Sequence, residues 1–158
     1  MATGQWCVKG SGVTIGSDTD LEGKIVSEIA ISGGETTKTV LSSMDGSNFT
    51  CFGNQNDFEL SFDMVVTGSD NNPATYVYGS GTTVSTTTTI DFSNDGAQSN
   101  DVVIDLGANS DGYTCVYTFS GCQGVTGVPK FGLGSAHVMT VNLTCNPDQV
   151  SQVIDTSP

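Results

Sequence analysis

The residues from 58 to 64 alternate strictly between apolar and polar side chains. Four apolar side chains are interleaved with three polar ones: Phe58, Leu60, Phe62 and Met64 with Glu59, Ser61 and Asp63. A period of two predicts a β-strand with one face in a core and the other in water. A chain built from such strands must cover one face of each sheet, so this pattern limits the fold to packed or closed β-architectures.

Other segments repeat the strand pattern. Thr114 and Thr118 alternate with apolar neighbours between 113 and 120, and Thr140 and Asn142 do so between 136 and 145. β-Branched and apolar residues predict further strands over 25–31, 36–41, 48–52, 86–92 and 102–106. Three sequences with Gly or Asn supply turns between strands: Asp45-Gly46, Asn94-Asp95-Gly96 and Ser110-Asp111-Gly112.

One segment carries helix signals. Asn72 is a suitable N-cap, Pro73 suits the first helical position, and Gly79 suits the C-terminal end of a short helix over 74–78. We therefore expect an all-β fold of two packed antiparallel sheets, a sandwich or barrel, with one short flanking α-helix. The 158 residues suit a single domain, and its strand edges need a closed barrel, a second sheet or another chain to cover them.

The charge of the chain limits its partners. It has 17 acidic residues, four lysines and no arginine, a formal net charge of −13. Affinity for nucleic acid rests on clustered Lys or Arg, and these lysines stand far apart in the sequence. No apolar stretch suits a signal peptide or a spanning helix, which predicts a chain made and kept in the cytosol.

No catalytic pattern is present. The sequence lacks the motifs of serine hydrolases, zinc proteases and nucleotide-binding loops. His137 lies within an alternating strand pattern, which favours a structural histidine. Asp18, Asp20 and Glu22 alternate in a loop but do not match a calcium-binding pattern. We expect no enzyme, no metal site and no cofactor.

The five cysteines leave two interpretations open. An odd number without a CxxC pair favours buried free thiols. The alternative is a secreted β-sandwich binding module, such as an adhesin, a lectin-like domain or a pilus subunit. In that case Cys115 and Cys122 would be bridged across a strand pair, and the triplets at Asn48 and Asn142 would carry glycans.

Taken in order, several segments resemble the tail tube proteins of long-tailed bacteriophages, a family similar to the ring-forming tube protein of type VI secretion. The N-terminal half of the match comprises residues 9–14, 24–29, 33–35, 44–46, 57–63 and the helix at 72–79. The C-terminal half comprises residues 102–105, 111–112, 117–121, 125–127 and 136–143. In that family a Phe-Ser-Gly strand runs into a Val-Thr-Gly connection, as Phe119 to Gly127 are expected to do here.

The resemblance implies a structural virion protein, the major tail tube subunit. Six copies at −13 each would bring −78 formal charges to a ring, and stacked rings would form a conduit through which genomic DNA passes without specific binding. The implied partners are further copies, a tape measure protein, tail terminator and baseplate or tail-tip proteins, and a sheath if the tail contracts, with no membrane. The chain would be synthesised in the host cytoplasm and reside in the phage tail. Another virion role, such as head decoration or tail termination, is a further alternative.

The same resemblance suggests which residues carry out assembly. Acidic side chains on polar strand faces are expected to line the lumen: Glu59, Asp63, Asp101 and Asp105. Three segments are expected to contact other subunits or rings: the N-terminal arm 1–9, the long loop 32–47 and the C-terminal tail 147–158. The contact residues expected in these segments are Trp6, Lys9, Glu35, Met44, Val150 and Ile154.

Overall fold

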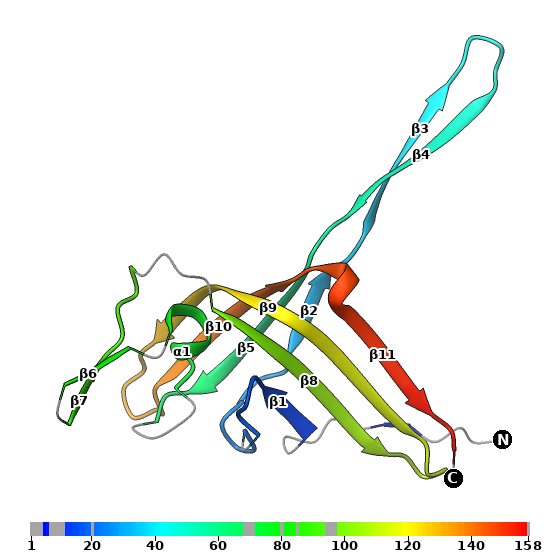
Figure 1. Ribbon diagram of the computed structural model, residues 1–158. Coiled ribbons are helices and arrows are strands. Elements are labelled where there is room, and N and C mark those ends of the chain that lie inside the picture. The colour runs from blue at the N-terminus through cyan, green and yellow to red at the C-terminus, as the bar shows by residue number, and fades with distance from the viewer. Residues whose placement is uncertain are drawn as a thin grey trace.

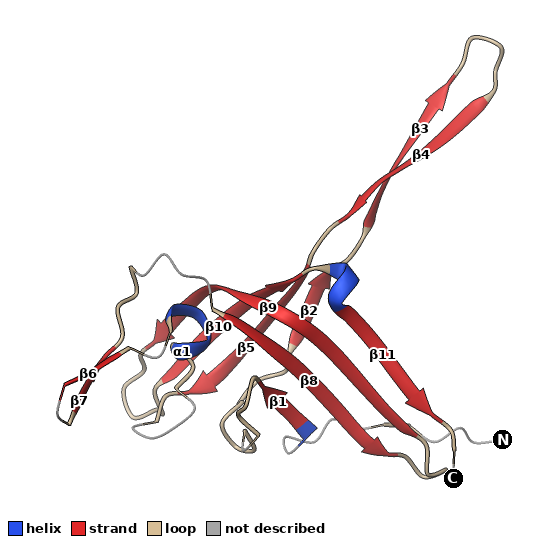
Figure 2. Ribbon diagram, viewed as in Figure 1, coloured by secondary structure: helices blue, strands red, loops and turns tan. Residues whose placement is uncertain are grey.

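The computed structural model describes residues 5–6, 12–19, 21–67, 72–79, 81–84, 86–93 and 98–157. These residues form an all-β fold with one short α-helix, as predicted (Figures 1 and 2). The elements follow in the order β1 (Val13–Ile15), β2 (Ala30–Gly33), β3 (Thr36–Ser42), β4 (Asn48–Gln55), β5 (Phe58–Val65), α1 (Thr75–Tyr78), β6 (Thr82–Val84), β7 (Thr87–Thr89), β8 (Ser99–Ala108), β9 (Thr114–Lys130), β10 (Val138–Cys145), a 3-10 turn (Pro147–Gln149) and β11 (Val150–Asp155).

The main sheet has seven antiparallel strands. Its order is β1-β8-β9-β10-β5-β2, with β11 paired to β9. The first part of β9, residues 114–123, pairs with β8 and, over 114–119, with β11. The second part of β9, residues 123–130, pairs with β10. The β3–β4 and β6–β7 pairs are separate two-stranded ribbons. In Figure 1 the β3–β4 ribbon projects away from the main sheet.

Strand β9 is longer than the sequence indicates. Residues 125–127 were expected to form a connection, but they lie inside the 17-residue strand. The glycines there make room for neighbouring elements. A Cβ on Gly124 would lie 2.6 Å from Val77 Cα in α1, and one on Gly127 would lie 2.9 Å from the sulfur of Met139. The glycines that suggested a turn are therefore required by close packing.

A β-bulge bends β9 near its middle. The register shifts where Ser120 and Gly121 on β9 oppose Asp101 on β8. Gly121 has a φ of 64°, and its N–H donates to the carboxylate of Asp101 at 2.8 Å. Such a bulge increases local twist and bends the strand.

The inner side of the sheet encloses the core. Helix α1 and the segment around Leu21 pack against it. The helix begins at Thr75, one residue later than predicted, with Ala74 in place of Asn72 at the N-cap. The Asn72 side chain accepts from the Ala74 N–H at 3.1 Å in the turn before the helix. Gly79 follows the helix with a φ of 96°. The strand residues of the core come from β1, β5, β8, β9 and β10: Val13, Ile15, Leu60, Phe62, Met64, Val102, Ile104, Phe119, Cys122, Met139, Val141, Leu143 and Cys145.

Several predicted element boundaries are wrong. The strand expected over 25–31 is interrupted: Ile25 forms an isolated bridge with Met64, and regular pairing resumes only at Ala30. The break falls where the Ser27 hydroxyl, in place of a backbone group, accepts the Asp63 N–H at 2.7 Å. Within the strand expected over 86–92, only Thr87–Thr89 are in a strand, β7, which pairs with β6 (Thr82–Val84).

The segments expected as a long loop and a tail are also ordered in strands. Residues 32–47 contain the end of β2 and all of β3, with the Asp45-Gly46 turn at the tip of a hairpin as predicted. Residues 147–158 contain β11, which pairs with residues 114–119 of β9. The turn expected at 94–96 lies outside the described residues.

Because α1 packs closely on β9, adding a single methyl group to β9 at this contact should lower the stability of the fold. Gly124→Ala would place its Cβ against backbone atoms of α1 and should destabilise the fold by about 1–3 kcal/mol. Gly132→Ala is the matched control, because its Cβ would meet nothing closer than 3.4 Å. Urea denaturation measures both changes. Equal stability of the two variants would contradict the packing described here.

Candidate functional site

The outer face of the main sheet is rich in small polar residues. Because Leu60, Phe62 and Met64 face the core, Glu59, Ser61 and Asp63 face outward from β5. The register places Thr144, Asn142 and Thr140 of β10 directly beside them. The next strand adds Thr126, Val128 and Lys130. We call this surface of β5, β10 and the second part of β9 the polar face.

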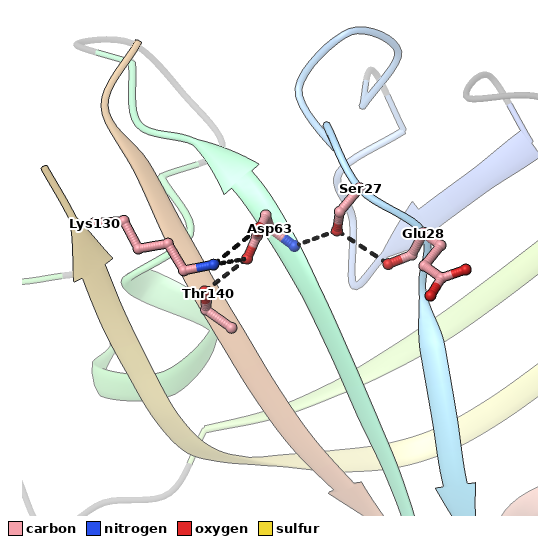
Figure 3. A network of polar contacts seen from close by, with 5 residues as sticks. All are labelled: Ser27, Glu28, Asp63, Lys130 and Thr140. Atoms are coloured by element: carbon pink, nitrogen blue, oxygen red, sulfur yellow. Dashed lines mark hydrogen bonds and ion pairs between the residues drawn. The ribbon is translucent and has the colours of Figure 1, made fainter. Parts of the chain in front are cut away.

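Asp63 is the centre of a polar network on this face (Figure 3). Its carboxylate accepts from the Thr140 hydroxyl at 2.6 Å and lies 3.1 Å from the Lys130 ammonium nitrogen. These hydrogen bonds, with the positive charge of Lys130, hold the pKa of Asp63 below its ordinary value. Within the described residues Lys130 is the one cation on the polar face, and Asp63 neutralises it.

The four acids predicted to line a lumen all lie on the outward side of the sheet, but they do not form one cluster. Glu59 and Asp63 lie on β5, whereas Asp101 and Asp105 lie on β8. The sequence suggested that the two strands were neighbours. The structure places β9 and β10 between them. Asp101 and Asp105 also accept backbone N–H groups, from Gly121 and Gly107, each at 2.8 Å.

The β3–β4 ribbon, here called the arm, is exposed along its whole length. Its register gives it two faces. Leu41, Phe49 and Cys51 lie on one face, and Val40 and Phe52 lie on the other. Four of these large apolar side chains are 53% to 70% exposed: Val40, Leu41, Phe49 and Phe52. An isolated two-stranded hairpin is marginal in water, so apolar side chains on both faces indicate a surface that another molecule covers.

The predicted contact residues differ in their surroundings. Met44 is fully exposed at the arm's tip, and the Glu35 carboxylate accepts from Asn56 at 3.0 Å at the arm's base. The Trp6 indole donates to the Tyr113 carbonyl of its own chain at 3.0 Å. Val150 packs against the core, while Ile154 on β11 is half exposed. Lys9 lies outside the described residues.

Three strands leave one edge unpaired among the described residues. β1 and β2 stand at the two ends of the sheet, and β11 pairs only with β9. Exposed edges carry unsatisfied N–H and C=O groups and invite pairing with another strand. Strand β11 was not predicted, because residues 150–155 do not alternate between apolar and polar side chains.

An apolar pocket of about 520 Å³ opens between the two ends of the sheet. One wall carries Ile25, Ile29 and Ile31, and the opposite wall carries Ile104, Leu106 and Tyr117. Glu28 is the only charged residue among the described residues of its lining. This pocket was not predicted from the sequence, because its walls come from segments about 80 residues apart.

The cysteines exclude the bridge suggested for a secreted module. Cys115 and Cys122 are both buried free thiols in the one strand β9. Seven residues of extended strand separate their Cα atoms by about 23 Å, far beyond disulfide reach. Cys51 and Cys145 are also free.

No group of His, Cys, Asp and Glu in the described part of the chain is arranged to hold a metal ion. Asp18, from the loop considered for calcium, accepts from the Tyr76 hydroxyl at 2.7 Å, and Asp20 lies outside the described residues. The ring of His137 stacks on Phe131. No described helix is long and apolar enough to span a membrane.

The network at Asp63 predicts a pH-dependent contribution to stability. Folding lowers the pKa of Asp63, so its interactions stabilise the fold above the ordinary Asp value of about 3.9 and are lost as the pH falls through the lower folded-state value. Asp63→Asn should therefore cost about 1 kcal/mol at pH 7 and little at pH 2, measured by urea denaturation. A difference independent of pH would contradict this role.

No protein-family model and no curated protein matches the chain. Solved structures do match. One is a chain of the sheath-tube complex of an extracellular contractile injection system, PVC, in the extended state, with 14% identity, a TM-score of 0.57 and coverage of 90% of this chain and 87% of that one.

Two further structures agree. A chain of the sheath/tube terminator of the same system matches with 11% identity, a TM-score of 0.56 and coverage of 89% and 91%. A chain of the tube-terminating cap of the anti-feeding prophage matches with 14% identity, a TM-score of 0.55 and coverage of 99% and 95%. At these identities the likeness is one of fold: the chain has a tail-tube-like fold, as its sequence suggested.

Proposed function

We propose that the chain is a structural tail protein, the subunit of a hollow tube made from stacked six-membered rings. The observation that carries this proposal is the open-edged main sheet, which buries one face in its own core and leaves the other polar and exposed. In a ring, the edge of one copy pairs with or packs against its neighbour. The ring then closes a continuous barrel without free edges.

In this arrangement the polar face lines the lumen. Glu59 and Asp63 contribute negative charge there, and the salt bridge between Asp63 and Lys130 removes the one described positive site on this face. A wall of like sign repels phosphates, so double-stranded DNA would slide through without being held. Asp101 and Asp105 lie on β8, outside the polar face. They line the bore in this proposal only if the outer surface of β8 also faces the central axis.

The arm supports contact between rings in this proposal. It projects from the body (Figure 1), and its exposed apolar side chains need a partner surface. A tube of this kind would end at a terminator and a baseplate or tail tip, enclose a tape measure protein and, in a contractile particle, carry a sheath. The assembled tail would be the site of action.

The test is electron microscopy of the purified chain in two salt concentrations. We expect six-fold rings or hollow tubes at 300 mM salt and less stacking at 10 mM, because the net charge of −13 per copy repels other copies when screening is weak. Equal stacking at both concentrations would contradict the electrostatic account. The absence of rings and tubes over a wide range of protein concentration would contradict the proposed function.

A further inference from the structure

We propose that one face of the arm docks in the apolar pocket of a second copy of this chain. The docking face is defined by Lys38, Val40 and Phe52, and the receiving surface is the pocket between the two ends of the main sheet. This inference rests on the proposed function and deepens it, because it names both halves of a contact between copies.

Among the described residues the pocket is left open on one side. Its walls are almost entirely aliphatic and aromatic, yet it is open, and Ile31 at its margin is 43% exposed. A volume of about 520 Å³ has room for more than one large side chain. Filling it with apolar groups would remove both surfaces from water, at a gain of roughly 25 cal/mol per Å² of apolar area.

The arm offers apolar side chains of suitable size. Phe52 pairs with Lys38 across the ribbon, and Val40 pairs with Thr50 on the same face. Phe52 is 70% exposed and Val40 is 53% exposed. Nothing described in its own chain covers this face, and in Figure 1 the arm leads away from the sheet that holds the pocket. The pocket that receives it therefore belongs to another copy.

Charge favours this pairing and selects this face of the arm. Lys38 is the one lysine on the arm, and among the described residues Glu28 is the one charged residue that lines the pocket. Both are exposed, and among the described residues neither forms an ion pair within its own chain. Figure 3 shows the Glu28 carboxylate pointing away from the network at Asp63. An ion pair at the rim of an apolar contact fixes its register and excludes wrong partners.

The arm and the pocket are different surfaces of one molecule. A contact between two different surfaces is heterologous, so each copy that docks its arm still offers a free pocket. Such a contact does not stop at a dimer. A heterologous contact closes into a ring or continues along a filament, depending on the rotation between copies. We assign this one to the second case, which links one ring to the next along the tube.

The first experiment exchanges the charges. Lys38→Glu and Glu28→Lys should each raise the critical concentration for stacking by about fivefold or more, measured by sedimentation at fixed salt, because each places like charges opposite one another. The double variant should return to within about twofold of the original value. Circular dichroism checks that each variant is folded. Unchanged assembly of the single variants, or no recovery in the double variant, would overturn the proposal.

The second experiment traps the contact. Cysteines at positions 28 and 38, in a Cys51→Ser background, should form disulfides between copies with oxidised glutathione and give a ladder of covalent multimers in a denaturing gel. The matched control carries the second cysteine at Thr39, which lies on the opposite face of the arm, and should give no ladder.

The combined outcomes separate the two proposals. Tubes in the microscope without a ladder would overturn the docking contact and leave the proposed tube standing. A ladder at position 38 without rings or tubes would support the docking contact and overturn the tube. A ladder of equal strength from position 39 would overturn the assigned face of the arm.

Discussion

The close contact between strand β9 and helix α1 is the constraint on which the rest of the structure depends. β9 bonds to β8, β10 and β11, so it places both ends of the main sheet. It does so for 17 residues only because Gly124 and Gly127 carry no side chain where α1 and Met139 approach. Helix α1 packs on these glycines and covers the part of the inner face beside them, and the bulge at Gly121 bends the strand.

This packing leaves the outer face and the edges of the sheet without a partner. The alternating apolar residues of β5 and β10 are buried in the core. The residues between them face outward and include Glu59, Asp63, Thr140, Asn142 and Thr144. Such a face needs no cover, whereas the edges of β1, β2 and β11 and the apolar arm do. The edges and the arm are therefore the surfaces that the proposed assembly uses, and the polar face is the one it leaves in water.

The sequence predicted those parts of the fold that depend on local patterns. Alternation identified β5 and β10 and the faces of their residues, and Asn72 and Gly79 marked the helix. It failed where a residue type has two uses. The connection expected over 125–127 is instead part of β9, because a glycine that makes room for a neighbouring element, such as Gly127, cannot be distinguished in sequence from one that bends the chain.

The candidate site likewise combines features that a local sequence pattern predicts with features that depend on strand order. The acidic residues on β5 were correctly placed on the outward face, but the distance between β5 and β8 depends on strand order, which no local pattern encodes. The pocket beside Ile29 and Leu106 was not foreseen for the same reason. The salt bridge between Lys130 and Asp63 joins residues 67 positions apart and required the register of three strands.

The orientation of the polar face tests the account most directly. A cryo-electron microscopy reconstruction of the assembled chain, at a resolution that shows side chains, would place each face of the main sheet relative to the central axis. The account predicts that Glu59, Asp63 and Thr140 point into the bore and that Asp63 remains paired with Lys130. A reconstruction with these residues on the outer surface, or buried between neighbouring copies, would contradict it.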